Sequence, residues 1–218
     1  MHHDFWHERW QAGQIGFHQS AVHPLLARWW PRLGLPNEAR VYVPLCGKSL
    51  DMVWLADRRH TIVGSELSPI AIRDFFAGRG LEPAQTDESG FRRHAAGPFE
   101  IIEGDALALT PALLGPVAAA YDRAALVALP PDLRRPYAES LARLLPSGAK
   151  ALLIAFEYPQ EMKGGPPFSV EAAEIQALFE PDFRVDQVER LDILAESPKF
   201  AEVGIPALFE TVFLMERR

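Results

Sequence analysis

Strand-like and helix-like segments alternate from residue 40 onward, and this order is the strongest constraint on the fold. Residues 40–45 (RVYVPL) are rich in β-forming side chains, and residues 49–59 space apolar side chains at helical intervals. Residues 61–65 (TIVGS) repeat the strand signal. Ser68, followed by proline, is a favourable start for a helix over 70–79. The pattern predicts consecutive βαβ units.

Three further strands are predicted at residues 99–103, 117–121 and 149–156, with a helix at 131–145 between the last two. Such alternation is typical of a mainly parallel sheet with helices on both faces. In these sheets the ligand binds beyond the carboxyl ends of the strands, where the strand order reverses. The turns that follow the strands are therefore the places to search for a site.

The end of the chain departs from this alternation. Residues 183–194 and 207–216 are β-rich, and the connection between them is too short for a helical crossover, so we expect them to pair antiparallel. The predicted fold class is α/β, with a doubly wound, mostly parallel seven-stranded sheet that ends in an antiparallel hairpin. This is the pattern of class I S-adenosylmethionine-dependent methyltransferases, although periodicity alone leaves other doubly wound folds open.

The length of 218 residues predicts a single domain, with an N-terminal lid segment at 1–35 and an α/β core at 36–218. Trp6 and Trp10 are four residues apart, so they share one face of a short helix. Packing of that helix on the sheet accounts equally well for Trp6. The glycines that follow favour a lid that carries Trp10 and Phe17 over a ligand.

The composition limits the partners. A formal net charge of −7 and a pI near 5.5 disfavour binding to nucleic acid, which needs a basic face. The apolar runs are shorter than the roughly 20 residues that span a bilayer, and the N-terminus lacks a signal-peptide pattern, so we expect a cytoplasmic protein that does not bind membranes. We also expect a monomer, a small-molecule ligand and no metal, because the N-terminal histidines lack zinc-motif spacing.

Residues 47–49 (Gly-Lys-Ser) look like the tail of a phosphate-binding loop. Such a loop needs a glycine five positions before this Gly, where the chain has Tyr42, and Pro44 removes another backbone donor. A dinucleotide fingerprint also fails, because Gly47 is the lone glycine of the turn. A turn with one glycine still lets a nucleoside approach the backbone closely.

Acidic residues follow the next two strands. Glu66 ends the second strand, 19 residues after Gly47 (66 − 47), a separation at which a carboxylate binds a ribose diol in this kind of sheet. Its alternative role is to favour the N-terminus of the next helix. Gly104 and Asp105 follow the third strand, where Asp105 either reaches an adenine or caps a short helix.

The fourth strand is followed by Asp122 and Arg123, which place a charged pair near the same edge; a structural salt bridge is the alternative. Cys46 lies in the first turn. A cysteine nucleophile needs a base or a positive site nearby, and the sequence offers no evident histidine partner, so we expect a small buried thiol. A single cysteine also excludes an internal disulfide.

Five segments at the predicted turns and strand ends form an ordered set. They are WHERW at 6–10 with Gly13 and FHQ at 17–19, VPLCGK at 43–48, VGSELS at 63–68, DRAALVA at 122–128 and GPPF at 165–168. In this order and spacing the chain resembles the thiopurine S-methyltransferase family, including its bacterial members, over nearly its whole length. Ala124 stands where a glycine often occurs in that family.

The resemblance implies S-adenosylmethionine as methyl donor and a sulfur acceptor. Trp10, Leu45, Glu66 and Arg123 match the donor-binding positions of the family, and Phe17 matches the aromatic residue that contacts the acceptor ring. Trp10 would wall the methionine part, Leu45 would contribute backbone at the first turn, and Glu66 would hold the ribose. Arg123 would lie beside both donor and acceptor.

The loop at 164–168 lies where the family closes its acceptor pocket, which implies contacts from Pro166 and Phe168; a rigid turn before the next helix is the alternative. The acceptors implied are thiopurines, other aromatic or heterocyclic thiols, and selenium or tellurium species. We expect Arg123 to favour the acceptor thiolate and Asp122 to orient the guanidinium.

Two rival functions remain at this point. A nicotinamide-dependent oxidoreductase uses a similar sheet, although the lone Gly47 argues against binding of its diphosphate. A non-catalytic nucleoside-binding protein on the same fold is the other. Binding of NAD(H) without S-adenosylmethionine distinguishes the first, and donor binding without methyl transfer distinguishes the second.

Overall fold

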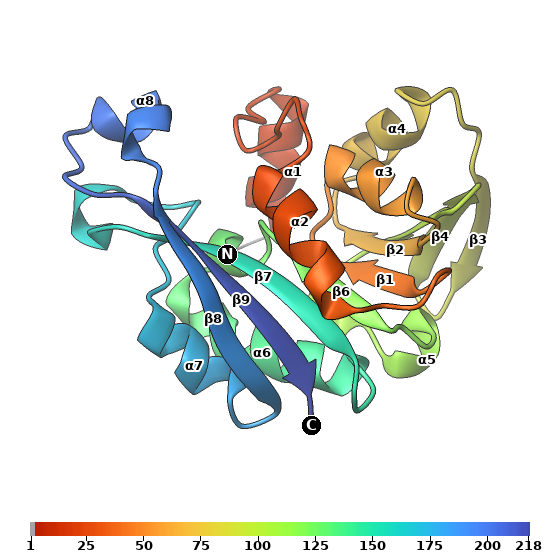
Figure 1. Ribbon diagram of the computed structural model, residues 1–218. Helices are drawn as coiled ribbons and strands as arrows, with labels where there is room; N and C mark the ends of the chain where they lie inside the picture. The colour runs from red at the N-terminus through yellow and green to blue at the C-terminus, as the bar shows by residue number, and fades with distance from the viewer. Residues whose placement is uncertain (1–2) are drawn as a thin grey trace.

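The computed structural model describes residues 3–218, which form one nine-stranded mixed sheet with helices on both faces (Figure 1). The strand order is β3-β4-β5-β2-β1-β6-β7-β9-β8. His2, one of the N-terminal histidines weighed above, lies outside the described residues. None of the helices in this described part is long and apolar enough to cross a membrane.

Most of the strands are short, and β8 and β9, which form the final hairpin, are the longest. They are β1 Arg40–Val43, β2 Thr61–Glu66, β3 Ala84–Glu88, β4 Phe91–Ala96, β5 Phe99–Glu103, β6 Ala119–Asp122, β7 Lys150–Glu157, β8 Phe183–Asp192 and β9 Phe209–Arg217. The α-helices are α1 His3–Gln11, α2 Pro24–Trp29, α3 Leu50–Ala56, α4 Pro69–Ala77, α5 Pro111–Leu114, α6 Pro131–Leu144, α7 Ala172–Phe179 and α8 Pro198–Ala201. Short 3-10 helices are η1 Trp30–Leu33, η2 Ala106–Ala108, η3 Leu126–Ala128, η4 Gln160–Met162 and η5 Leu194–Glu196.

The five central strands, β5, β2, β1, β6 and β7, run parallel to one another. β9 then pairs antiparallel with both β7 and β8, so the predicted hairpin at the end of the chain is confirmed. The strand order reverses between β1 and β6, because β2 lies on one side of β1 and β6 on the other. The predicted ligand edge is therefore the carboxyl ends of β1, β2, β5 and β6.

The sheet has two strands more than the seven predicted. β3 and β4 form a hairpin that adds to the free edge of β5 in antiparallel pairing. All five residues of β3 (AQTDE) are exposed, and their sequence lacks the alternation of apolar and polar residues that indicates a half-buried strand. Backbone pairing and ion pairs across the hairpin, such as Arg92 with Asp87 at 2.9 Å, hold it in place.

The core lies in two layers, one on each face of the sheet. The layer that includes α5, α6 and α7 contains Leu113, Tyr137, Leu141, Ile175 and Phe179. The layer that includes α2, α3 and α4 contains Leu26, Met52, Leu55, Phe75 and Phe76. Because both faces are covered, the central strands are buried on both sides, and the polar turns at their ends remain accessible for a site.

Candidate active site

The first strand-to-helix turn joins β1 to α3 without a phosphate cradle. Leu45 and Gly47 both have positive φ, 47° and 52°, so the backbone folds back tightly after the strand. Ser49 caps α3 through its Oγ, which accepts a hydrogen bond from the Asp51 amide at 3.1 Å. Lys48 lies 3.7 Å from Asp74 of α4 and is engaged in this ion pair.

Glu66, at the end of β2, joins the first turn to the second. Its Oε2 accepts the Gly47 amide at 2.8 Å and its Oε1 accepts the Ser68 amide at 2.7 Å. Burial raises the pKa of the Glu66 carboxyl, and the backbone hydrogen bonds oppose that rise. Because Ser68 is the N-cap of α4, the helix-favouring role of Glu66 is present in the structure. Its contact with a ribose stays a prediction.

Gly104 and Asp105 follow β5 at the same edge. The Gly104 amide donates to the Glu66 carbonyl at 2.9 Å, so the turns after β2 and β5 are tied together. Gly104 has φ 148°, and a Cβ there would lie 2.5 Å from the Phe91 ring of β4. Asp105 Oδ1 accepts a hydrogen bond from the Leu107 amide at 2.9 Å and so caps η2, the alternative role that was predicted for it. Adenine contact by Asp105 stays a prediction.

Asp122 does not orient Arg123 as expected. The Asp122 carboxylate instead accepts the Ala125 and Leu126 amides and the Tyr137 hydroxyl, the last at 2.6 Å. Its side chain lies in the core between β6 and α6, and burial raises the pKa of Asp122 to about 6. Asp122 therefore shapes the turn that carries Arg123, because it fixes the backbone at 125–126.

Arg123 pairs with Asp51, a residue that the sequence analysis did not select. Arg123 Nε lies 3.7 Å from Asp51 Oδ2, and Arg123 Nη1 donates to the Phe17 carbonyl over 3.5 Å. The contact arises because β1 and β6 are neighbours, which brings the start of α3 beside the end of β6. A lone aspartate in the first turn of a helix gave no signal of this partnership.

The N-terminal segment covers the first turn. Trp10 is buried, and its ring lies 3.4 Å from where a Cβ on Gly47 would stand. Phe17 packs edge-on against both Trp6 and Trp10, with ring centroids 5.6 Å apart in each pair. Trp6 thus packs within the lid, on Phe17. The aromatic cluster places Trp10 and Phe17 together above the edge that carries Glu66 and Arg123.

Positive charge gathers around His18 in this lid. Burial lowers the pKa of His18, and the neighbouring cations Lys48, Arg123 and Arg79 lower it further, so the imidazole is neutral at pH 7. On the opposite side of the lid, a Cβ at Gly16 would lie 3.0 Å from Lys199 Nζ of α8. Figure 1 shows α1 and α8 at the same end of the molecule. Several cationic side chains therefore lie near the lid, and two of them, Lys48 and Arg123, are paired with carboxylates.

The loop at 164–168 contacts the segment that follows Arg123. The Phe168 amide donates to the Val127 carbonyl of η3 at 2.6 Å, and the Tyr158 hydroxyl donates to the Pro167 carbonyl at 2.6 Å. The Gly165–Pro166 and Pro166–Pro167 peptides are cis. The loop is thus both a firmly held turn and a neighbour of the predicted site, and acceptor contacts from Pro166 and Phe168 stay predictions.

Cys46 is buried behind the first turn, which confirms the expectation of a buried thiol. Burial and the nearby Glu66 carboxylate raise the pKa of the Cys46 thiol well above its usual value. A Cβ on Gly64 of β2 would lie 2.6 Å from Cys46 Sγ, so the thiol fills the space that a glycine leaves. A protonated, enclosed thiol is a poor nucleophile.

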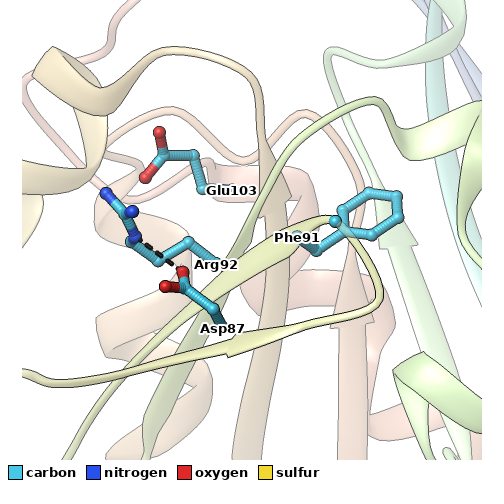
Figure 2. Close-up of a pocket in the computed structure, with 5 residues that line it drawn as sticks. Asp87, Phe91, Arg92 and Glu103 are labelled. Carbon is cyan, nitrogen blue, oxygen red and sulfur yellow. Dashed lines mark hydrogen bonds and ion pairs between the residues drawn. The ribbon is translucent and has the colours of Figure 1, made fainter.

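One hollow of the described surface lies beside this edge. A shallow depression of about 300 Å³ is lined by Asp87, Gly90, Phe91, Arg92 and Glu103 (Figure 2). In Figure 2, Arg92 pairs with Asp87 while the Phe91 ring points away from that pair. The depression adjoins Gly104 through Glu103 and Phe91, which are the last residue of β5 and the first of β4.

Comparison with known proteins identifies the family of the chain. The family profile described as Thiopurine S-methyltransferase (TPMT) matches residues 1–218. The chain belongs to the thiopurine S-methyltransferase family. It is 50% identical over 215 residues to a thiopurine S-methyltransferase of Xanthomonas axonopodis pv. citri, with 99% of both chains covered. The corresponding protein of Nitrosomonas eutropha is 46% identical over 217 residues, covering 100% of this chain and 99% of the relative.

Solved structures agree with the class I methyltransferase fold. An S-adenosylmethionine-dependent methyltransferase from Anabaena variabilis has a TM-score of 0.67 at 16% identity, covering 99% of this chain and 95% of that one. A 1,6-didemethyltoxoflavin-N1-methyltransferase from Burkholderia thailandensis, solved with S-adenosylhomocysteine, has a TM-score of 0.65 at 16% identity, covering 99% and 86%. This thiopurine S-methyltransferase family member is an S-adenosylmethionine-dependent methyltransferase with a small-molecule acceptor.

Proposed function

We propose that this methyltransferase transfers the methyl group of S-adenosylmethionine to the sulfur of aromatic or heterocyclic thiols, thiopurines among them. The observation that carries the proposal is the position of Arg123, which is held at the ligand edge beneath the Phe17 carbonyl. Glu66 and Gly47 meet at the same edge. A site for a nucleoside donor therefore lies next to a cation that suits an anionic sulfur.

The residues of the edge fit the donor. Glu66 places a carboxylate at the strand end, where it accepts hydrogen bonds from two backbone N–H groups. The same carboxylate is suited to accept hydrogen bonds from the two hydroxyl groups of a ribose. Leu45 and Gly47 bring backbone close to a ligand without a diphosphate cradle. Trp10 offers an aromatic wall for a cationic sulfonium. We assign Gly104 and Asp105 to the base of the donor.

The acceptor side lies between the lid and the 164–168 loop. Phe17 supplies an aromatic ring on which a heterocycle stacks, and the Phe168 backbone is fixed beside η3, which follows Arg123. We place the acceptor ring against Phe17, with Pro166 and Phe168 closing the pocket. The cations around His18 favour an acceptor that is negatively charged at sulfur.

The chemistry is an in-line displacement at carbon. The donor supplies a methyl group on a positively charged sulfonium, whose leaving group departs neutral. The thiol loses its proton to solvent, a process that Arg123 favours electrostatically; then the acceptor S–C bond forms as the donor C–S bond breaks. The remaining task of the protein is alignment and exclusion of water, and effective molarities of about 10⁵ to 10⁸ M show how much alignment supplies.

The proposal extends to selenium and tellurium nucleophiles, because these are soft like a thiolate and need no general acid. We further propose a monomeric cytoplasmic enzyme that binds neither nucleic acid nor membranes. The net charge of −7 supports the absence of binding to nucleic acid and membranes, since phosphate-rich polymers and anionic lipid surfaces repel an acidic protein.

A methyl-transfer panel tests the acceptor. We expect labelled methyl from S-adenosylmethionine to appear on 6-mercaptopurine and thiophenols, and on selenite-derived species, but not on matched phenols or anilines. Labelling confined to oxygen or nitrogen acceptors contradicts the sulfur assignment. Donor binding without transfer to any acceptor of the panel indicates a nucleoside-binding protein.

A thermal-shift comparison tests the donor independently of turnover. A ligand at 100 times its Kd stabilises the fold by about 2.7 kcal/mol. We expect S-adenosylmethionine and S-adenosylhomocysteine to raise the Tm, and NADH at the same concentration to leave it unchanged. Stabilisation by NADH alone contradicts the proposal and favours an oxidoreductase.

A further inference from the structure

Asp51 sits at the start of α3, is buried with 1% of the residue exposed, and has three partners outside that helix, one just before α2 and two in β6 and the turn that follows it. Asp51 Oδ1 accepts the His23 amide at 2.8 Å, and Asp51 Oδ2 accepts the Tyr121 hydroxyl at 2.9 Å. Arg123 Nε lies 3.7 Å from the same Oδ2. A buried carboxylate needs a compensating charge, and the Arg123 guanidinium supplies it.

These contacts close a ring around the segment from Phe17 to His23. At one end of the segment, the Phe17 carbonyl accepts Arg123 Nη1 over 3.5 Å. At the other end, the His23 amide donates to Asp51. Because Asp51 and Arg123 are themselves paired, the acceptor-side lid is fastened at both ends to one ion pair.

The His23 end of the ring is rigid. His23 Nδ1 accepts the Leu25 amide at 3.3 Å as the N-cap of α2, so Nε2 carries a hydrogen and donates to Glu210 Oε1 of β9 at 3.0 Å. Both side chains of this pair are buried. The His23 amide, which donates a hydrogen bond to Asp51, is thus fixed to the sheet through Glu210, and this hydrogen bond holds the Asp51 carboxylate in place.

We propose that Asp51 positions Arg123 for the acceptor, through the buried ion pair and the ring that it closes with the 17–23 segment. The inference rests on the proposed function, because it assumes that Arg123 acts on the acceptor sulfur. Asp51 touches neither donor nor acceptor. It sets where the positive charge stands and keeps the lid segment over it.

The primary test is Asp51→Asn, which keeps the shape of the side chain and an acceptor oxygen but removes the charge. We expect kcat/KM for 6-mercaptopurine to fall about 10- to 100-fold, the scale on which small misplacements act. The pH dependence of turnover is the more specific readout. A guanidinium beside a bound thiol lowers the thiol pKa, and the pKa of the bound thiol governs the pH profile of kcat. Misplacement of the guanidinium therefore moves the rising limb of the kcat profile to higher pH by about one unit.

A merely structural role would not move that pH profile. Glu100→Gln is the matched carboxylate control, because Glu100 pairs with Arg40 at 2.9 Å near the opposite, amino-terminal edge of the sheet. We expect it to retain the kinetics of the unmodified enzyme.

A double-variant cycle separates this inference from the proposed function. Asp51→Asn added to Arg123→Ala should cause no further loss of kcat/KM beyond that of Arg123→Ala alone. If Arg123→Ala leaves acceptor turnover and donor affinity unchanged, the role of Arg123 in the proposed function is wrong. If Arg123→Ala lowers turnover but Asp51→Asn does not, only the inference about Asp51 is overturned.

A second variant decides the question if Asp51→Asn does not fold. Arg123→Lys keeps the charge but lacks the Nε–H and the planar fork that face Asp51. With the fold intact by circular dichroism, we expect it to reproduce the fall in kcat/KM and the alkaline shift. Kinetics and a pH profile like those of the unmodified enzyme would show that orientation by Asp51 has no part in turnover.

Discussion

The Glu66 carboxylate accepts the Gly47 amide at 2.8 Å, which links the end of β2 to the turn after β1. This contact joins two segments that the sheet places side by side, since β1 and β2 are paired strands. A carboxylate already fixed at the strand end binds a diol with little reorganisation.

We expect Glu66→Gln to weaken S-adenosylmethionine binding about tenfold or more, because hydrogen bonds to a charged acceptor are worth about 1.5–3 kcal/mol. The amide NH₂ also faces either the Gly47 or the Ser68 amide, so one backbone donor loses its partner. Calorimetric titration measures the affinity. Glu216→Gln, at an ion pair with Lys150 outside the site, is the control, and equal affinity in both variants would rule out the ribose role.

Gly104→Ala should destabilise the fold more than Gly97→Ala. Both glycines have positive φ, 148° and 57°, but a Cβ at Gly104 meets the Phe91 ring at 2.5 Å whereas Gly97 has open space. Overpacking typically costs about 1–3 kcal/mol beyond the backbone strain. Urea unfolding compares the two variants. Relief of the difference by Phe91→Ala would identify the ring as its cause, and equal destabilisation would refute the clash.

Asp122 gives the stability a characteristic pH dependence. The pKa of Asp122 is about 6 in the folded protein, against an ordinary value of 3.8 that applies to the unfolded chain, so the folded state binds the proton more tightly. The contribution of Asp122 protonation to the free energy of unfolding is therefore fully present below pH 4 and is lost as the pH rises through 6. The change is on the order of 3 kcal/mol. We expect the stability advantage over Asp122→Asn to shrink from pH 4 to pH 7 in denaturant titrations. A constant difference would contradict the raised pKa.

We expect Trp10→Ala to lower donor affinity about tenfold, because the ring covers Gly47 and an aromatic contact adds about 0.5–1.5 kcal/mol to the burial of its area. Trp54→Ala is the control, since the Trp54 ring on α3 stacks beneath the Arg58 guanidinium, whose Cζ lies 3.2 Å from the ring centroid. Fluorescence titration with S-adenosylhomocysteine measures both. Similar affinities for the two variants would remove Trp10 from the donor site.

The alternation of strands and helices could be predicted because each element carries its own local signal. The β2 run and the Ser68 cap of α4 lie where the sequence places them, and the Ser68 Oγ accepts the Ala71 amide. The β3–β4 hairpin could not be predicted, because its strands are exposed and polar on the β3 side. Its stability comes from pairing with β5, a contact between segments rather than a pattern within one.

The site follows the same division. Residues such as Glu66 and Gly47 follow strands directly, and the sequence alone identified their turns. The sequence also offered Asp122 as the partner of Arg123, since the two are adjacent. The tertiary structure decided otherwise: the strand order sets β6 beside β1, so Arg123 meets Asp51 while Asp122 turns into the core toward Tyr137. Local sequence determines which elements form and where their turns lie, whereas charge pairing depends on which elements the sheet makes neighbours.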